Sequence, residues 1–182
     1  MTGLAGPGDV IAFWREAGPD RWFTTDLSFD ALCRERFLLS HECAAAGDLD
    51  EWEHTADGAL ALLILLDQLP RNMFRGTRRT WATDASALLA AERAIERGFD
   101  REMSPDMRRF FYLPFMHAED LAAQERSVVL NDALGYPEIV KFARHHHDVV
   151  VRFGRFPHRN AVLGRQTTAE EAAFLKEDDF RG

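Results

Sequence analysis

Helical periodicity runs along almost the whole chain and limits the possible fold more than any other feature. Apolar residues recur every three or four positions, and no stretch shows a convincing strand-like alternation of apolar and polar residues. Glycine and proline stop the periodic segments at Gly18-Pro19, Gly47 and Gly98. The sequence therefore predicts an all-α protein. Short loops between successive helices predict antiparallel neighbours, stacked as a bundle or as a solenoid of helix pairs.

The expected helices begin and end at local signals. Ser28 is the expected N-cap of a helix over 29–46, and Thr55 is expected to start an apolar helix that runs to Gln68. Pro70 is expected to break or kink that helix, because proline clashes with the preceding turn. Further helices are expected over 80–97, from Ser104-Pro105 to an interruption at Pro114, over 115–134, over 139–153 and after a capping box of Thr168 and Glu171.

The length and charge of the chain limit its class. With 182 residues and 46% hydrophobic content, it is expected to form one all-α domain over residues 1–182. The net charge is −8, yet the segment from Lys141 to Arg165 carries +5, so the remainder carries −13. A second basic run spans Arg71 to Arg79. Two local basic runs in an acidic chain fit a small anionic partner, whereas nucleic acid requires a broad basic face and is not expected.

Cysteine usage and hydropathy indicate a cytoplasmic protein. Cys33 and Cys43 fall in one expected helix, where the rise per residue places them about 15 Å apart, too far for a disulfide. Free thiols suit a reducing compartment, and the first residues show no secretory signal. The apolar run from Ala59 to Leu66 is closed by Asp67, well short of the ~20 residues that a membrane span needs. It predicts a buried helix and no membrane partner.

A polar corner is expected between Arg152 and Arg165. Gly154 and Pro157 stop the preceding helix, and Phe153 and Phe156 are expected to point inward and fix the corner. Polar groups held in this way are candidates for a binding site. They are Arg152, Arg155, His158, Arg159 and Asn160.

Two further clusters of polar residues each admit two interpretations. Asp67, Gln68, Arg71 and Asn72 bracket Pro70, where they form either a ligand site or, as favoured for the cluster alone, an internal salt bridge with capping. His117, Asp120 and Gln124 are spaced at i, i+3 and i+7, so they share a face of the expected helix, with Glu119 beside them. This spacing fits a metal site, a His–carboxylate acid/base pair, or a hydrogen-bond network between helices.

The histidine run 145–147 does not predict a metal site. Successive helical residues point about 100° apart, so the three imidazoles cannot meet at one ion. His146 shares a face with Val149 and Val150 and is expected to point inward, as a core histidine bonded to a carboxylate. Cys33, His41 and Cys43 lack the paired spacing of a zinc site. Neither a metal nor a cofactor is expected.

Three blocks of this sequence resemble the signature blocks of the bacterial domain-of-unknown-function 924 family. They are Asp67-Gln-Leu-Pro-Arg-Asn72 with Arg75-Gly76, Leu113-Pro-Phe-Met-His-Ala-Glu-Asp120 with Gln124, and His146 to Arg165. Phe13-Trp14, Arg21-Trp-Phe23 and Phe29-Asp30 also resemble the family's N-terminal segment. The resemblance implies a tetratricopeptide-like arrangement of antiparallel helix pairs, as a bundle or a short superhelix, and no established reaction. The sequence departs from the family pattern at Ala118, where a serine is common.

Two functional hypotheses follow, and they leave open whether the protein is an enzyme. In the first, the blocks converge on one pocket, where Arg71, Arg155 and Arg159 hold a small anionic molecule. In the second, a tetratricopeptide-like scaffold binds a peptide or protein, and the polar blocks are struts between helices. The candidate acid/base residues are His117, Glu119, Asp120 and His158, and the candidate ligand contacts are Asp67, Gln68, Arg71, Asn72, Gln124, His146, Arg152, Arg155, Arg159 and Asn160.

Overall fold

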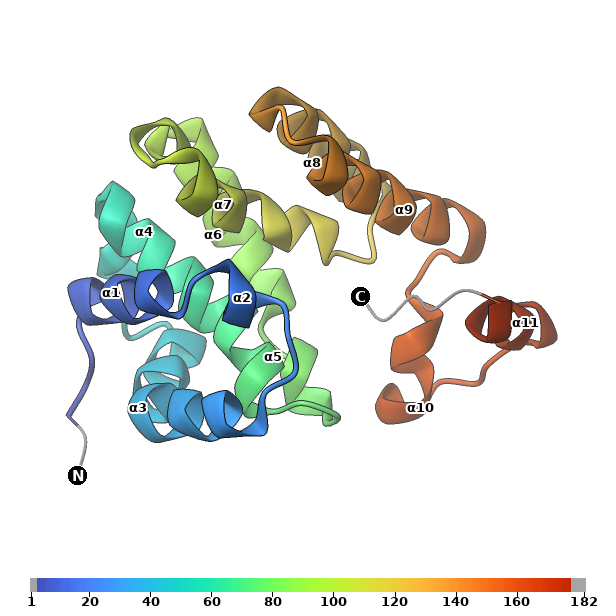
Figure 1. Cartoon of the computed structure of the whole chain (residues 1–182), viewed down its shortest axis with the longest axis horizontal. Coiled ribbons are helices and arrows are strands. Elements are labelled where there is room, and N and C mark those ends of the chain that lie inside the picture. Colours follow the sequence, from blue (N-terminus) through green and yellow to red (C-terminus); the bar gives the residue numbers. More distant parts are fainter. Residues whose placement is uncertain (1–2, 178–182) are drawn as a thin grey trace. The chain divides into compact units, whose positions relative to one another are not determined.

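The computed structural model describes residues 3–177, and every regular element among them is helical (Figure 1). The all-α fold is therefore confirmed. The chain divides into two compact units, Met1–Pro114 and Phe115–Gly182, and the single domain stays a prediction. The α-helices are α1 (Pro7–Ala17), α2 (Pro19–Trp22), α3 (Leu27–Ala46), α4 (Ala56–Leu63), α5 (Leu69–Met73), α6 (Asp84–Glu96), α7 (Pro105–Met116), α8 (Leu121–Leu134), α9 (Pro137–Phe153), α10 (Asn160–Leu163) and α11 (Ala169–Glu177). Short 3₁₀ turns span Asp50–His54, Arg78–Trp81, Phe99–Glu102 and Pro157–Arg159.

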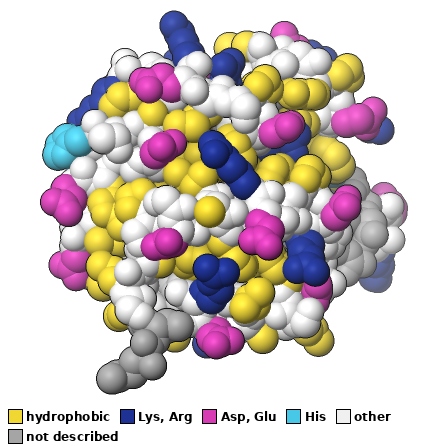
Figure 2. All heavy atoms as spheres, turned by 60° about the vertical axis from the view of Figure 1, so that its left-hand side comes forward, with side chains coloured by type: hydrophobic (Ala, Val, Ile, Leu, Met, Phe, Trp, Pro, Cys, Tyr) yellow, Lys and Arg dark blue, Asp and Glu magenta, His cyan; other side chains and the backbone are white. Residues whose placement is uncertain are grey.

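Helix α4 is the centre of the first unit. All of its residues except Asp57 are buried, Leu60 to Leu63 included, because α1 and α6 pack against it. Each fully buried leucine contributes roughly 1.5–3 kcal/mol relative to an exposed one. The expected buried helix is confirmed, and no helix within residues 3–177 is long and apolar enough to cross a membrane. On the face drawn in Figure 2, hydrophobic side chains lie interspersed with acidic and basic ones.

Of the expected break or kink at Pro70, the break does not occur, because a π turn accommodates the proline. The helix widens over Ile64–Gln68, where the Leu69 amide donates to the Ile64 carbonyl five residues back, and α5 then continues with Pro70 in its first turn. Pro70 has no N–H, so the carbonyls of Leu65 and Leu66 lose the donor that it would have supplied. His41 Nδ1 donates to the Leu65 carbonyl (2.9 Å), and the Thr83 hydroxyl donates to that of Leu66 (2.5 Å).

Two expected helix starts in the first unit were wrong. Asp26, not Ser28, is the N-cap of α3, because its Oδ1 accepts from the amides of residues 28 (2.9 Å) and 29 (3.2 Å). The helix expected from Thr80 begins at Asp84. The Thr80 hydroxyl donates to the Phe74 carbonyl (2.6 Å), which ties this segment to the preceding turn.

The chain between α7 and α8 also differs from the expected pattern. Helix α7 continues two residues past Pro114 to Met116, because proline removes only one amide donor from the helix. The helix expected from residue 115 begins at Leu121, after a non-helical turn over residues 117–120. This turn carries three of the candidate acid/base residues.

The second unit consists of α8 and α9, which lie side by side, followed by α10 and α11 (Figure 1). Gly154 ends α9 with a left-handed φ of 68°, a conformation that only glycine adopts readily. Phe156 is fully buried just beyond it, in a small core with Val149, Val150 and Phe174. The expected corner with an inward-pointing Phe156 is thereby confirmed.

Candidate functional site

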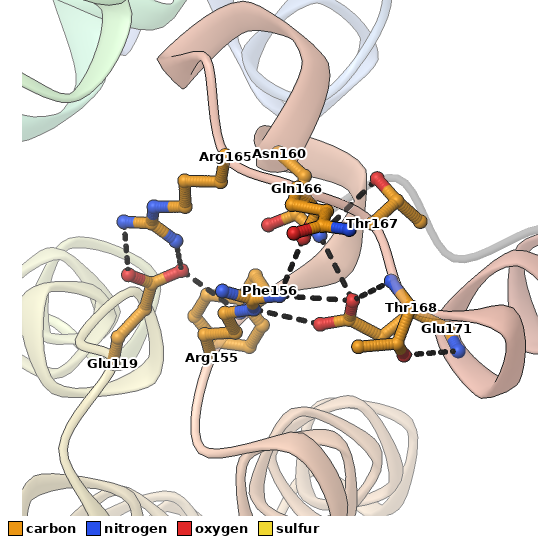
Figure 3. A network of polar contacts seen from close by, with 9 residues as sticks. All are labelled: Glu119, Arg155, Phe156, Asn160, Arg165, Gln166, Thr167, Thr168 and Glu171. Atoms are coloured by element: carbon orange, nitrogen blue, oxygen red, sulfur yellow. Dashed lines mark hydrogen bonds and ion pairs between the residues drawn. The ribbon is translucent and has the colours of Figure 1, made fainter.

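The second and third sequence blocks meet at Glu119 in the second unit (Figure 3). The Glu119 carboxylate accepts two hydrogen bonds from the Arg165 guanidinium (2.7 and 2.6 Å) and one from the Phe156 amide (2.8 Å). Burial opposes the ionisation of Glu119, but these donors outweigh it and lower the pKa of the carboxyl below its usual value. Glu119 therefore ties the turn after α7 to the corner after α9.

A second carboxylate, Glu171 on α11, anchors the same corner (Figure 3). Arg155 donates to both of its oxygens (2.7 and 2.9 Å), and Asn160 Nδ2 donates to one of them (3.3 Å). The Thr168 amide donates to Glu171 Oε2 (2.7 Å), while the Glu171 amide donates to the Thr168 hydroxyl (3.1 Å), so the expected capping box is confirmed. The hydrogen bonds from Arg155 are the main cause of the low Glu171 pKa, about 2.

Arg159 is the most deeply buried arginine of the corner, with 5% of its surface exposed. Its guanidinium lies over the ring of Phe156, 4.7 Å from the centroid, and donates to the backbone carbonyl of His117 (3.0 Å). A desolvated guanidinium interacts more strongly with charged groups than one in water. Arg159 therefore brings a buried positive charge to the turn between α7 and α8.

Two histidines lie beside the same phenylalanine. The rings of His146 and His158 lie 5.6 and 5.9 Å from that of Phe156. His146 is 7% exposed, as its helical face predicted, and its Nδ1 donates to the Phe142 carbonyl (2.9 Å). Burial is the main cause of the low pKa of His146, about 3; the charges of His117, His145 and His158 act in the same direction, and the hydrogen bond to Phe142 opposes them. The second unit therefore places basic groups from residues 117, 146 and 158–159 close together.

Asp120 and Gln124 do not share a helical face with His117, because the expected helix is interrupted between them. Asp120 is the N-cap of α8 and accepts from the Ala123 amide (2.8 Å). Gln124 Nε2 donates to three carbonyls at the end of α7, those of Phe115 (3.3 Å), Met116 (2.7 Å) and Ala118 (2.7 Å). Aspartate is a preferred N-cap residue, so Asp120 is itself a sequence signal that a new helix begins there and that the chain is non-helical just before it.

The first block lies in the first unit and is held by two aspartates. Arg71 donates to both carboxylate oxygens of Asp84 (2.9 and 3.0 Å) and to the backbone carbonyl of Asp67 (2.5 Å). Asn72 donates to Asp30 (2.8 Å). Gln68 donates to the Asp67 side chain. Sequence reasoning did not assign Asp30 or Asp84 to this block, since neither lies within one helical turn of it. Convergence of this block with the other two stays a prediction.

The remaining candidate, Arg152, pairs with Glu170 on the exposed surface of the second unit (2.8 Å). Such pairs contribute little to stability because water screens both charges. Within residues 3–177, no three His, Cys, Asp or Glu side chains are grouped so as to hold a metal ion. The corner of the second unit combines basic side chains, the buried ring of Phe156 and the carboxylates of Glu119 and Glu171.

An all-α fold with these three sequence blocks defines the class of this protein. The chain belongs to the DUF924 family, described as bacterial protein of unknown function, which matches residues 10–179. Among solved structures it is similar to the protein of unknown function ATU0120 from Agrobacterium tumefaciens. The two chains are 50% identical, and the match covers 94% of this chain and 97% of the other with a TM-score of 0.92. No curated protein matches the chain.

Proposed function

We propose that the second unit binds a small anionic molecule through Arg159 and the three histidines at positions 117, 146 and 158. The observation that supports this most directly is the placement of His146, His158 and Arg159 around the buried ring of Phe156, with Arg159 also donating to the backbone carbonyl of His117. Basic groups crowded in a desolvated place destabilise one another's charged forms. A bound anion would reverse that effect, because the low local dielectric strengthens the attraction between the anion and the basic groups.

The other polar candidates support this site from outside it. Arg71 and Arg155 each donate two hydrogen bonds to a carboxylate, so we assign them structural roles rather than direct contact with the anion. Glu119 and Asp120 bind Arg165 and the start of α8, respectively. Any acid–base chemistry at the site would therefore fall to the histidines.

A tetratricopeptide-like scaffold for a peptide is the second candidate, and a specific observation favours it. Arg71, Arg155 and Arg165 each donate two hydrogen bonds to a carboxylate. Such pairs hold separate segments of the chain together, as the scaffold hypothesis requires. An open surface pocket of about 680 Å³ in the second unit could receive such a partner. It is lined by Asp132, Gly135, Pro137, Val140, Lys141, Arg144, His145 and Asp148.

Thermal unfolding in a panel of phosphates, carboxylates and nucleotides at fixed ionic strength tests the anion site. A ligand at about 100 times its Kd stabilises the native state by roughly 2.7 kcal/mol. For a chain of this size the melting temperature should rise by roughly 5–11 °C. We expect such a rise with at least one compound and its loss in Arg159→Gln. The matched control is Arg152→Gln, which changes an exposed arginine of the same corner and should retain the shift.

Two results would count against the anion site. If no anion of the panel raised the melting temperature selectively, the proposed anion site would be rejected, since a ligand must stabilise the state that it binds. A shift that survives in Arg159→Gln would show that the anion binds elsewhere. A rise in melting temperature with a peptide added in the same assay, and with none of the small anions, would favour the scaffold.

A further inference from the structure

Gln124 has a buried acceptor that the fold does not use. The side chain is fully buried, and its Oε1 has no hydrogen-bond partner within residues 3–177. Asn160, which directly follows Arg159, has a second such oxygen, Oδ1, and is also fully buried. Buried amide oxygens are almost always paired with protein, water or ligand donors. Each of these two oxygens of the second unit therefore lacks the donor that a buried amide oxygen normally has.

The orientation of the Gln124 amide is fixed by its surroundings. Its nitrogen donates to the carbonyls of Phe115, Met116 and Ala118, none of which can donate in return. Exchanging the nitrogen and oxygen would place the oxygen against these carbonyl oxygens and lose all three bonds. The amide oxygen must therefore point away from this turn, as an acceptor.

Gln124 and Arg159 bind the same short turn. Arg159 donates to the carbonyl of His117, which lies between the Met116 and Ala118 carbonyls that Gln124 holds. Both buried side chains therefore hold the turn over residues 115–118. Arg159 supplies positive charge, while Gln124 Oε1 requires a hydrogen-bond donor.

We propose that the site takes an oxyanion that keeps a hydroxyl group, and that Gln124 Oε1 accepts from that hydroxyl. This inference rests on the proposed anion site and narrows its ligand class. Inorganic phosphate near neutral pH carries a P–OH group beside its charged oxygens, whereas sulfate has the same tetrahedral shape and no proton to donate. Sulfate carries the full charge of a dianion, so charge alone would favour it over phosphate. Tighter binding of phosphate than of sulfate would therefore indicate that Gln124 Oε1 accepts a hydrogen bond from the anion.

Calorimetric titration of the full chain with inorganic phosphate and with sulfate, at matched ionic strength, tests the inference. We expect phosphate to bind at least about tenfold more tightly, because a buried acceptor left unpaired by sulfate weakens binding by about that factor. Equal affinities within about twofold would overturn the inference and leave the anion site intact. Failure of phosphate to bind would also overturn it, and the anion panel then decides whether another anion uses the site.

Gln124→Lys provides the matched variant. The ammonium group can donate to the same three carbonyls but cannot accept a hydrogen bond. We expect the preference for phosphate over sulfate to fall to within about twofold in this variant, even where overall anion affinity rises. A preference retained in a folded variant would contradict the role of Gln124. If the variant does not fold, the comparison of the two anions on the natural chain decides alone.

Discussion

Replacing His146 with glutamine should change how the stability of the protein depends on pH. His146 is buried on α9, and its pKa in the folded protein is about 3, against an ordinary value of 6.5. The unfolded chain therefore binds a proton between these values while the folded chain does not. Stability from this residue is fully present above pH 6.5 and is lost progressively as the pH falls toward 3.

The size of the effect follows from the two pKa values. A pH of about 5 lies roughly one and a half units below the pKa of the histidine in the unfolded chain. Each unit of difference between pH and pKa is worth about 1.36 kcal/mol. The natural chain should therefore lose about 2 kcal/mol more than His146→Gln between about pH 7.5 and about pH 5. This difference changes little if the folded pKa moves by one unit, because the folded histidine is already neutral at pH 5.

Urea unfolding at the two pH values, followed by far-ultraviolet circular dichroism, measures this difference. Tryptophan fluorescence would report on the wrong unit, since all four tryptophans precede residue 115. Val150→Ala is the control, because it removes buried volume from the same helix without changing a titratable group. It should lower stability at both pH values and keep the pH dependence of the natural chain. Equal losses in the natural chain and His146→Gln would refute the desolvation argument.

Two further pairs of substitutions test how local packing limits the fold. Gly58→Ala should destabilise the protein by several kcal/mol, since its Cβ would lie 2.2 Å from the Trp52 carbonyl oxygen, whereas Gly8→Ala, with open space around its Cβ, should be neutral or stabilise by up to about 1 kcal/mol. Equal melting temperatures for the two variants would contradict this. Thr83→Val should cost about 1–3 kcal/mol in urea unfolding, because it removes the donor to the buried Leu66 carbonyl, and Pro70, four residues on, has no N–H to replace it. Thr24→Val, which removes an exposed hydroxyl bond, should change stability by less than about 0.5 kcal/mol, and a similar cost for both would show that the buried carbonyl finds another donor.

The sequence alone determined the features that depend on neighbouring residues. The all-α class, the buried α4, the glycine that ends α9 and the capping box of Thr168 and Glu171 were all predicted. Each rests on side-chain periodicity or on hydrogen bonds that close within about one helical turn. Such signals are written in consecutive residues, so they can be read without knowing how the chain packs.

Tertiary structure decided which polar groups are neighbours and what each one does. Arg71 meets Asp84 and Glu119 meets Arg165, while His41 and Thr83, distant in the sequence, donate to the carbonyls that Pro70 leaves without a donor. Arg71 and Asp84 lie 13 residues apart in the sequence, and Glu119 and Arg165 lie 46 residues apart. Residue type cannot distinguish a ligand-binding arginine from a structural one. That distinction depends on which carboxylate the packed helices bring close enough to share a desolvated hydrogen bond.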